Sequence, residues 1–168
     1  GGGGTGRVWE TTPDGREGYQ TIFLRRGFPV YIVDFPRRGR AGFPSYNGRF
    51  GEVDGAAIVP NQTNRAGVQY AWSRWRLGPK YPEVFPVQQF PMQGVDQFMQ
   101  HLVPTVSDNA EIISGALVAL LDKIGPAVVV THSQSGLFGW LAGARSPHVK
   151  GIVSYEPGFV FARDAMPA

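Results

Sequence analysis

The chain contains no cysteine, and this absence excludes disulfide bonds, cysteine-ligated zinc and a thiol nucleophile together. It also lacks any run approaching about 18 apolar residues, so the sequence predicts no membrane span. Charged residues make up only 17% of the chain, and the formal net charge is +3. Arg37, Arg38 and Arg40 form one small basic cluster, but no long face of lysine or arginine exists. Nucleic-acid binding is therefore not predicted.

The remaining composition is that of an ordinary globular protein. The chain has 168 residues, of which 42% are hydrophobic, and this length suits one sizeable core. The absence of cysteine fits either a reducing or an oxidising compartment, so a periplasmic or secreted location stays open. The glycine-rich start at Gly1–Gly4 and the loop-like residues 162–168 lead us to expect a segment of a larger folded unit.

Three apolar runs, at 28–34, 127–130 and 151–155, predict buried strands. Helices are predicted over 19–26, over 108–124 and from the turn after residue 130 to about residue 145. Asp108 and Glu111 predict a capping box for the second of these, and Gly125 followed by proline predicts its end. Strands that alternate with helices predict an α/β fold with a doubly wound, mostly parallel sheet covered on both faces.

The segment from about 37 to 105 interrupts this alternation. It is rich in glycine, proline and aromatic residues, with weak helical patterns at 66–77 and 93–102. We therefore predict a single domain over 1–168 with a loop-rich, lid-like insertion at about 37–105, because long excursions of this kind usually serve a pocket. The alternative is an ordered surface insertion held by its aromatic side chains.

The turn Thr131-His132-Ser133-Gln134-Ser135-Gly136 directly follows the central apolar run. A serine flanked by small residues at a sharp strand-to-helix turn is typical of an exposed nucleophile. Thr131 and Ser135 occupy the positions that glycine usually holds, so the motif is degenerate. The alternative interpretation is a polar loop between a strand and a helix.

Two carboxylates also lie at the carboxyl ends of predicted strands, where sites gather in parallel sheets. Glu156 lies in the turn Tyr155-Glu156-Pro157-Gly158 and is the better candidate for an acid that orients a histidine. The alternative for Glu156 is a solvated turn residue. Asp34 is the rival acid, although we expect it to cap the loop after its strand.

None of the three histidines suits the role of base. His132 precedes the serine and is expected to support the turn, because its side chain should leave in another direction. His148 enters the third strand at the opposite edge of the sheet, and His101 lies in the long excursion. A serine hydrolase needs such a base, because an unassisted hydroxyl is a poor nucleophile at neutral pH.

Five segments together resemble a group of bacterial esterases of the α/β-hydrolase superfamily. The resemblance runs in order along nearly the whole chain and is carried by Gly1-Gly2-Gly3-Gly4-Thr5-Gly6, Trp9-Glu10-Thr11-Thr12-Pro13-Asp14-Gly15, Arg76-Leu77-Gly78-Pro79-Lys80-Tyr81-Pro82, Thr131-His132-Ser133-Gln134-Ser135-Gly136 and Ile152-Val153-Ser154-Tyr155-Glu156-Pro157-Gly158.

The resemblance implies a serine carboxylesterase with an acyl-serine intermediate and with no metal or organic cofactor. It assigns Ser133 as nucleophile, Glu156 as triad acid after strand six, and the backbone of Gly2 and Gln134 as oxyanion hole. The chain would then run from the oxyanion loop to strand six, and the catalytic histidine would come from remaining segments of the same hydrolase. The implied partner is a small-molecule ester, and a homodimer is compatible with the resemblance.

Two alternative functions stay open at this point. Lactone or thioester hydrolysis uses the same serine machinery on another bond. A non-catalytic binding module with the same fold would need no base, which would account for the missing histidine.

Overall fold

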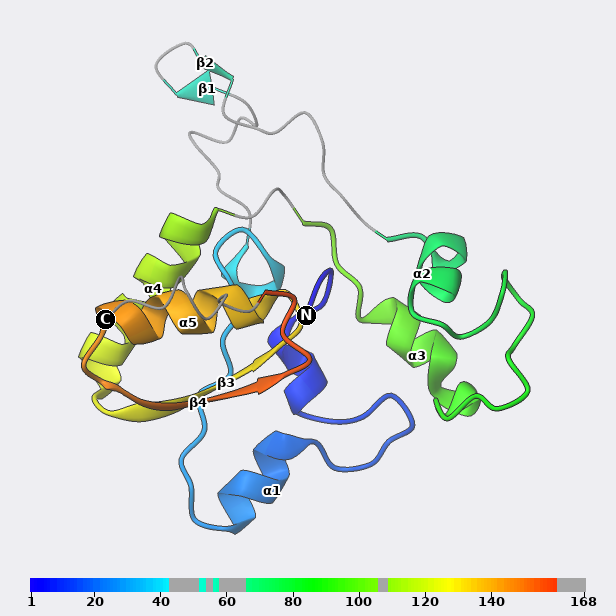
Figure 1. Cartoon of the computed structure of the whole chain (residues 1–168), viewed down its shortest axis with the longest axis horizontal. Helices are drawn as coiled ribbons and strands as arrows, with labels where there is room; N and C mark the ends of the chain where they lie inside the picture. The colour runs from blue at the N-terminus through cyan, green and yellow to red at the C-terminus, as the bar shows by residue number, and fades with distance from the viewer. Residues whose placement is uncertain (43–51, 54–55, 58–65, 106–108, 160–168) are drawn as a thin grey trace. The chain divides into compact units, whose positions relative to one another are not determined.

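The computed structural model describes residues 1–42, 52–53, 56–57, 66–105 and 109–159 (Figure 1). The chain forms two compact units, Gly1–Gly2 with Ser107–Ala168, and Gly3–Val106. Much of the predicted insertion, residues 43–51, 54–55 and 58–65, lies outside the described residues. The lid-like role of that segment and the predicted single domain remain predictions.

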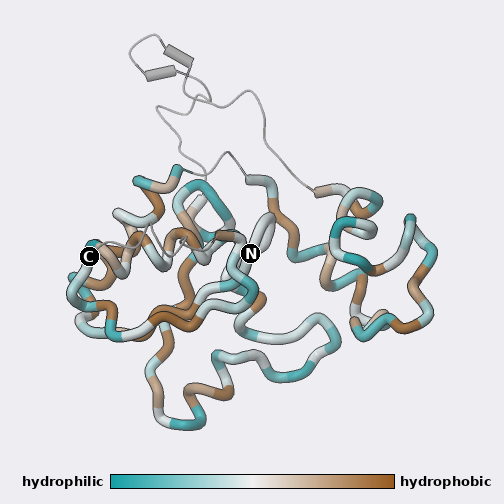
Figure 2. The backbone as a smooth tube through the Cα atoms, viewed as in Figure 1, coloured by the Kyte–Doolittle hydropathy of each residue, from teal (hydrophilic) through white to brown (hydrophobic). Residues whose placement is uncertain are grey.

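The unit that contains Ser107–Ala168 is built on a pair of parallel strands. Strands β3 (Ala127–His132) and β4 (Val149–Tyr155) pair in a register that matches the first residue of β3 with Val149 and its last with Tyr155. Helix α5 (Ser135–Arg145) connects the strands and packs on both of them. Helix α4 (Ala110–Ile124) packs against α5. Figure 2 shows that hydrophobic residues predominate along the two strands. This arrangement confirms an α/β fold with a parallel sheet.

Helix α4 has the apolar face that its sequence predicts. Every member of the face is buried or half-buried, namely Ile113, Leu117, Leu120, Leu121 and Ile124. The predicted capping box is wrong, however. The cap is Asn109, whose side chain accepts a hydrogen bond from the backbone of Ile112, and Asp108 lies outside the described residues. Glu111 instead pairs with Arg145 of α5 at 2.8 Å, because that guanidinium lies close to the first turn of α4.

Glycines let α5 lie directly on the strands. A Cβ atom added at Gly139 would stand 2.7 Å from Cγ2 of Thr131 in β3, and one added at Gly143 would stand 2.8 Å from Cδ1 of Ile152 in β4. The Thr131 methyl group is attached to a β-branched carbon and cannot rotate away freely. At Gly139 the helix therefore lies so close to β3 that no space remains for a side chain.

We expect Gly139→Ala to destabilise the protein by about 1–3 kcal/mol, because the added methyl group overpacks the contact with Thr131. The matched control is Gly115→Ala in α4, where an added Cβ meets nothing within 4 Å. That control should raise stability by about 0.5–1 kcal/mol through helix propensity. Urea unfolding of both variants measures the difference. Equal effects at the two positions would contradict the close approach at Gly139.

The unit Gly3–Val106 contains three short α-helices: α1 (Tyr19–Arg25), α2 (Val68–Arg74) and α3 (Val95–Gln100). It also contains the 3-10 turns η1 (Gly6–Trp9), η2 (Gly39–Ala41) and η3 (Met92–Gly94), and an antiparallel pair of β1 (Glu52–Val53) with β2 (Ala56–Ala57). Its core forms around α2 and α3 from Ala71, Trp72, Leu77, Met99 and Leu102. The predicted helices over 19–26, 66–77 and 93–102 are confirmed in shortened form.

The predicted strand over 28–34 is wrong for the described residues. Residues 30–34 alternate between half-buried and exposed positions as a strand would, but none of the described segments pairs with them. Phe28 is 61% exposed and Tyr31 is 62% exposed, so the run is not buried either. A strand requires hydrogen bonds from a neighbour, and an apolar run alone does not provide them.

Candidate active site

Ser133 has a left-handed backbone at the junction of β3 and α5. Its φ angle is +52°, a region that a residue with a Cβ atom enters at a cost of about 1–2 kcal/mol. Such strain persists only where the surroundings over-determine the conformation, and it is common at functional sites. A strained serine between a strand and a helix is the geometry expected of an exposed nucleophile.

Backbone hydrogen bonds hold Ser133 in this conformation. Its N–H donates to the carbonyl of Tyr155 at 3.0 Å, and its own carbonyl accepts from the N–H of Gly158 at 2.8 Å and of Gly136 at 2.9 Å. Tyr155 is the last residue of β4, and Gly158 belongs to the segment that follows it. The serine is therefore fixed against the turn that contains Glu156.

The hydroxyl groups that replace glycine in the degenerate motif have structural roles. Ser135 accepts a hydrogen bond from the backbone N–H of His132 at 2.9 Å and donates to the carbonyl of the same residue at 2.8 Å. Thr131 is hydrogen-bonded to Ser154 of β4 through their hydroxyl groups at 2.7 Å. The Ser135 side chain closes the turn, and the Thr131 side chain joins the two strands.

Glu156 lies beside this turn and is itself strained, with a φ angle of +42°. Its neighbour Pro157 contacts α5 so closely that a Cβ atom added at Gly136 would stand 2.5 Å from the proline Cβ. The carboxylate of Glu156 acts electrostatically on His132: burial lowers the pKa of His132, and the negative charge of Glu156 opposes that decrease. The structure thus brings Ser133, His132 and Glu156 into one neighbourhood.

The first two glycines lie at the same turn. A Cβ atom added at Gly1 would stand 2.9 Å from Nδ1 of His132 and 3.7 Å from Cβ of Ser133, and one added at Gly2 would stand 3.9 Å from Oε1 of Gln134. The His132 ring therefore packs against the Gly1 backbone. An oxyanion hole of Gly2 and Gln134 remains a prediction, and this proximity is compatible with it.

The other two histidines have positions of their own. His148 precedes β4, whose first residue pairs with the first residue of β3, so the strand length separates it from Ser133. Six residues of strand span about 20 Å. Nε2 of His148 instead lies 3.8 Å from Oδ1 of Asp122. His101 belongs to the other unit, where its ring is hydrogen-bonded to the carbonyl of Phe98 and burial lowers its pKa.

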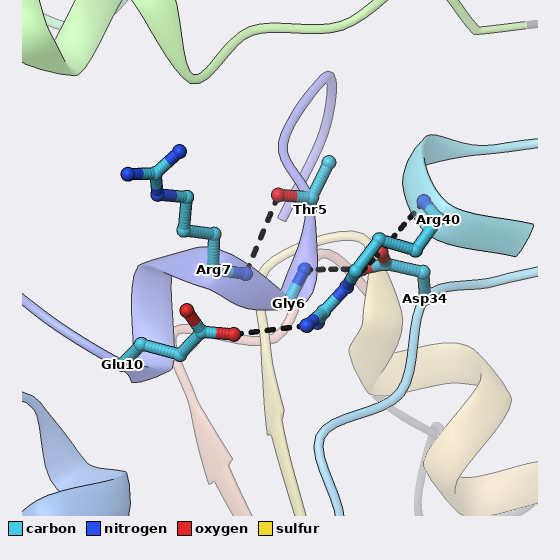
Figure 3. Close-up of polar contacts among 6 residues, drawn as sticks. All are labelled: Thr5, Gly6, Arg7, Glu10, Asp34 and Arg40. Atoms are coloured by element: carbon cyan, nitrogen blue, oxygen red, sulfur yellow. Dashed lines mark hydrogen bonds and ion pairs between the residues drawn. The ribbon is translucent and has the colours of Figure 1, made fainter.

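Asp34 is the centre of a structural network in the unit Gly3–Val106 (Figure 3). Its side chain is only 2% exposed and accepts hydrogen bonds from the backbone of Gly6 and from both the backbone and Nε of Arg40, the latter two at 2.9 Å. Arg40 also pairs with Glu10 at 2.9 Å. Burial alone would raise the pKa of Asp34, but these donors outweigh it and lower the pKa. Asp34 thus connects the segment at Gly6 with the loop at Arg40, and its bond to the Arg40 backbone agrees with the prediction that it caps the following loop.

Neither a metal cluster nor a membrane-spanning helix is found among the described residues. No three histidine or carboxylate side chains gather there closely enough to hold a metal ion. No helix in the described ranges combines the length and the apolar character needed to cross a bilayer.

Sequence reasoning missed the residues that position the serine. Gly136, Pro157 and Gly158 make the tight contact between the turn and the segment after β4, and none was singled out as a site residue. The Pro-Gly pair after Glu156 carries a turn signal. Only the register of β3 with β4 shows that this turn reaches Ser133.

Comparison with known proteins shows similarity to a curated protein and to solved structures. The chain is 38% identical over 162 residues to a fungal protein named "Probable secreted lipase phiG", with 94% of this chain and 43% of the relative aligned. It also superimposes on the solved structure of a bacterial esterase with a TM-score of 0.78 and 32% identity, over 97% of this chain and 53% of the esterase. The chain therefore spans about half the length of these relatives. No protein-family model matches it. Both relatives are named as ester-hydrolysing enzymes.

Proposed function

We propose that this chain carries the nucleophile of a serine carboxylesterase that hydrolyses small-molecule esters through an acyl-serine intermediate. The observation that carries the proposal is the left-handed Ser133 between β3 and α5, held by hydrogen bonds to Tyr155 and Gly158 on either side of Glu156. The similarity to a named lipase and to a bacterial esterase supports the same reaction class.

In the proposed reaction, Oγ of Ser133 attacks the carbonyl carbon of the ester while a base removes the hydroxyl proton. The tetrahedral oxyanion accepts hydrogen bonds from the backbone N–H groups of Gln134 and Gly2. The carbon–oxygen bond to the alcohol then breaks, and the alcohol leaves with the proton from the base. Water repeats the sequence on the acyl-serine and releases the carboxylic acid.

Glu156 has the proposed role of orienting a histidine base and stabilising the imidazolium that forms during attack. A histidine from polypeptide beyond these 168 residues would meet that requirement, since His132 packs against Gly1 and His148 lies at the far end of β4. The proposed doubly wound sheet would be completed by the same polypeptide. The fungal relative is named as secreted, which supports a periplasmic or extracellular location.

The test is covalent labelling of the intact natural protein with a fluorophosphonate, followed by intact-mass analysis. We expect one adduct on the wild type and none on Ser133→Ala, because the probe reacts only with an activated serine hydroxyl. The matched control is Ser73→Ala, which removes an exposed serine on α2 and should label like the wild type.

Failure of the wild-type protein to label would overturn the esterase proposal and favour the binding-module alternative. Turnover of a panel of nitrophenyl esters, thioesters and lactones then decides which bond is cleaved. We expect the esters to be the best substrates.

A further inference from the structure

A cavity lies directly beside the serine turn. Its volume is about 350 Å³, at the lower end of ligand pockets, and it is lined by Ala110, Gln134, Leu137, Phe138, Gly158 and Phe159. These residues come from the start of α4, from the turn and first helical residues after Ser133, and from the segment that follows β4.

Two walls of the cavity are fixed to the nucleophile. Gln134 is its covalent neighbour, and the Gly158 N–H donates to the Ser133 carbonyl at 2.8 Å. Leu137 lies one helical turn beyond Ser133. A group bound in this cavity therefore lies next to the turn that carries Ser133, and small shifts of reacting atoms have large effects on rate.

The cavity has the chemistry of an apolar binding site. Four of its lining residues, Ala110, Leu137, Phe138 and Phe159, are hydrophobic, and none of the described lining residues carries an ionisable side chain. A buried charge without a partner is strongly disfavoured in such surroundings. An uncharged hydrocarbon group gains free energy from the same surfaces.

We propose that this cavity is the specificity pocket of the enzyme and holds the uncharged hydrocarbon group on one side of the scissile ester, with Leu137 setting its length. The inference rests on the proposed esterase function. Leu137 is half-buried on α5, whereas Phe138 is only 3% exposed and belongs to the core. Leu137 is thus a wall on α5 that can be changed in size with less effect on folding than Phe138.

The experiment measures kcat/KM of the intact protein with nitrophenyl esters of acetyl, butyryl, hexanoyl and octanoyl groups, and with acetate esters of a matched series of alcohols. Leu137→Trp fills the cavity and should lower kcat/KM for the longer chains by about tenfold or more while acetyl changes little. Leu137→Ala enlarges it and should raise the octanoyl-to-acetyl ratio by about tenfold. Leu141→Ala, one turn further along α5 and outside the cavity, is the matched control and should leave the profile unchanged.

The two series identify which group the cavity holds. If the Leu137 variants change the dependence of kcat/KM on chain length only in the acyl series, the cavity holds the acyl group. If they change it only in the alcohol series, the cavity holds the alcohol group. A succinyl ester adds a test of charge, because its carboxylate should make it at least about tenfold poorer than the uncharged pentanoyl ester. If the wild type labels with fluorophosphonate but the Leu137 variants keep its chain-length dependence in both series, the specificity-pocket proposal is overturned and the esterase proposal stands. A wild type that neither labels nor turns over any ester would overturn both proposals.

Discussion

Ser133→Gly is expected to abolish ester hydrolysis while leaving the protein at least as stable as the wild type. The loss should be about 10⁴-fold or more in kcat/KM, because the attacking oxygen is removed and residual rates come only from binding and the oxyanion donors. Stability should rise by up to about 1 kcal/mol, since glycine adopts the φ angle of +52° without the penalty that serine incurs. Initial rates and urea unfolding measure the two effects.

Activity and stability measured together distinguish backbone strain that serves catalysis from backbone strain that only shapes the turn. Arg76→Gly is the matched control, because Arg76 also has a left-handed backbone, at φ +59°, and is exposed. We expect that variant to gain stability in the same range and to keep its activity. A Ser133→Gly protein that retains hydrolysis would remove Ser133 from the mechanism, and one that unfolds would show that its side chain is needed for the turn.

Glu156→Gln is expected to lower kcat/KM by about 10³–10⁴-fold with little change in stability. The amide has nearly the same shape but no charge, so it neither orients a histidine base correctly nor stabilises the imidazolium. The rate of fluorophosphonate labelling should fall as well, because the serine loses its activation. Kinetics with a nitrophenyl ester and the time course of labelling are the two measurements.

A second glutamate provides the control for this change. Glu83 pairs with Lys80 on the surface at 3.2 Å, and Glu83→Gln should alter neither rate nor stability appreciably. A loss of less than about tenfold in Glu156→Gln, with the fold intact, would return Glu156 to the alternative role of a solvated turn residue. The assignment of the triad acid would then be wrong even if Ser133 is the nucleophile.

Local patterns predicted several elements correctly because the causes are local. The apolar face of α4 follows from a spacing of three and four residues, and Gly125 ends that helix with a φ angle of +87°. The order of β3, α5 and β4 follows from alternation along the chain. The same kind of reasoning failed for 28–34 and for the cap at Asp108. A strand depends on a neighbour, and a helix end can be capped by either of two adjacent polar residues.

The sequence by itself determined the parallel α/β character of Ala127–Tyr155 and singled out Ser133, because a strand, a sharp turn and a helix leave a readable pattern of apolar and small residues. Only the tertiary structure decided what surrounds that serine. The register of β3 with β4 brings Tyr155 and Gly158 to its backbone, and the contact of Gly136 with Pro157 holds the segment after β4 against α5. These contacts join residues more than 20 positions apart, and their geometry depends on packing that no local pattern encodes.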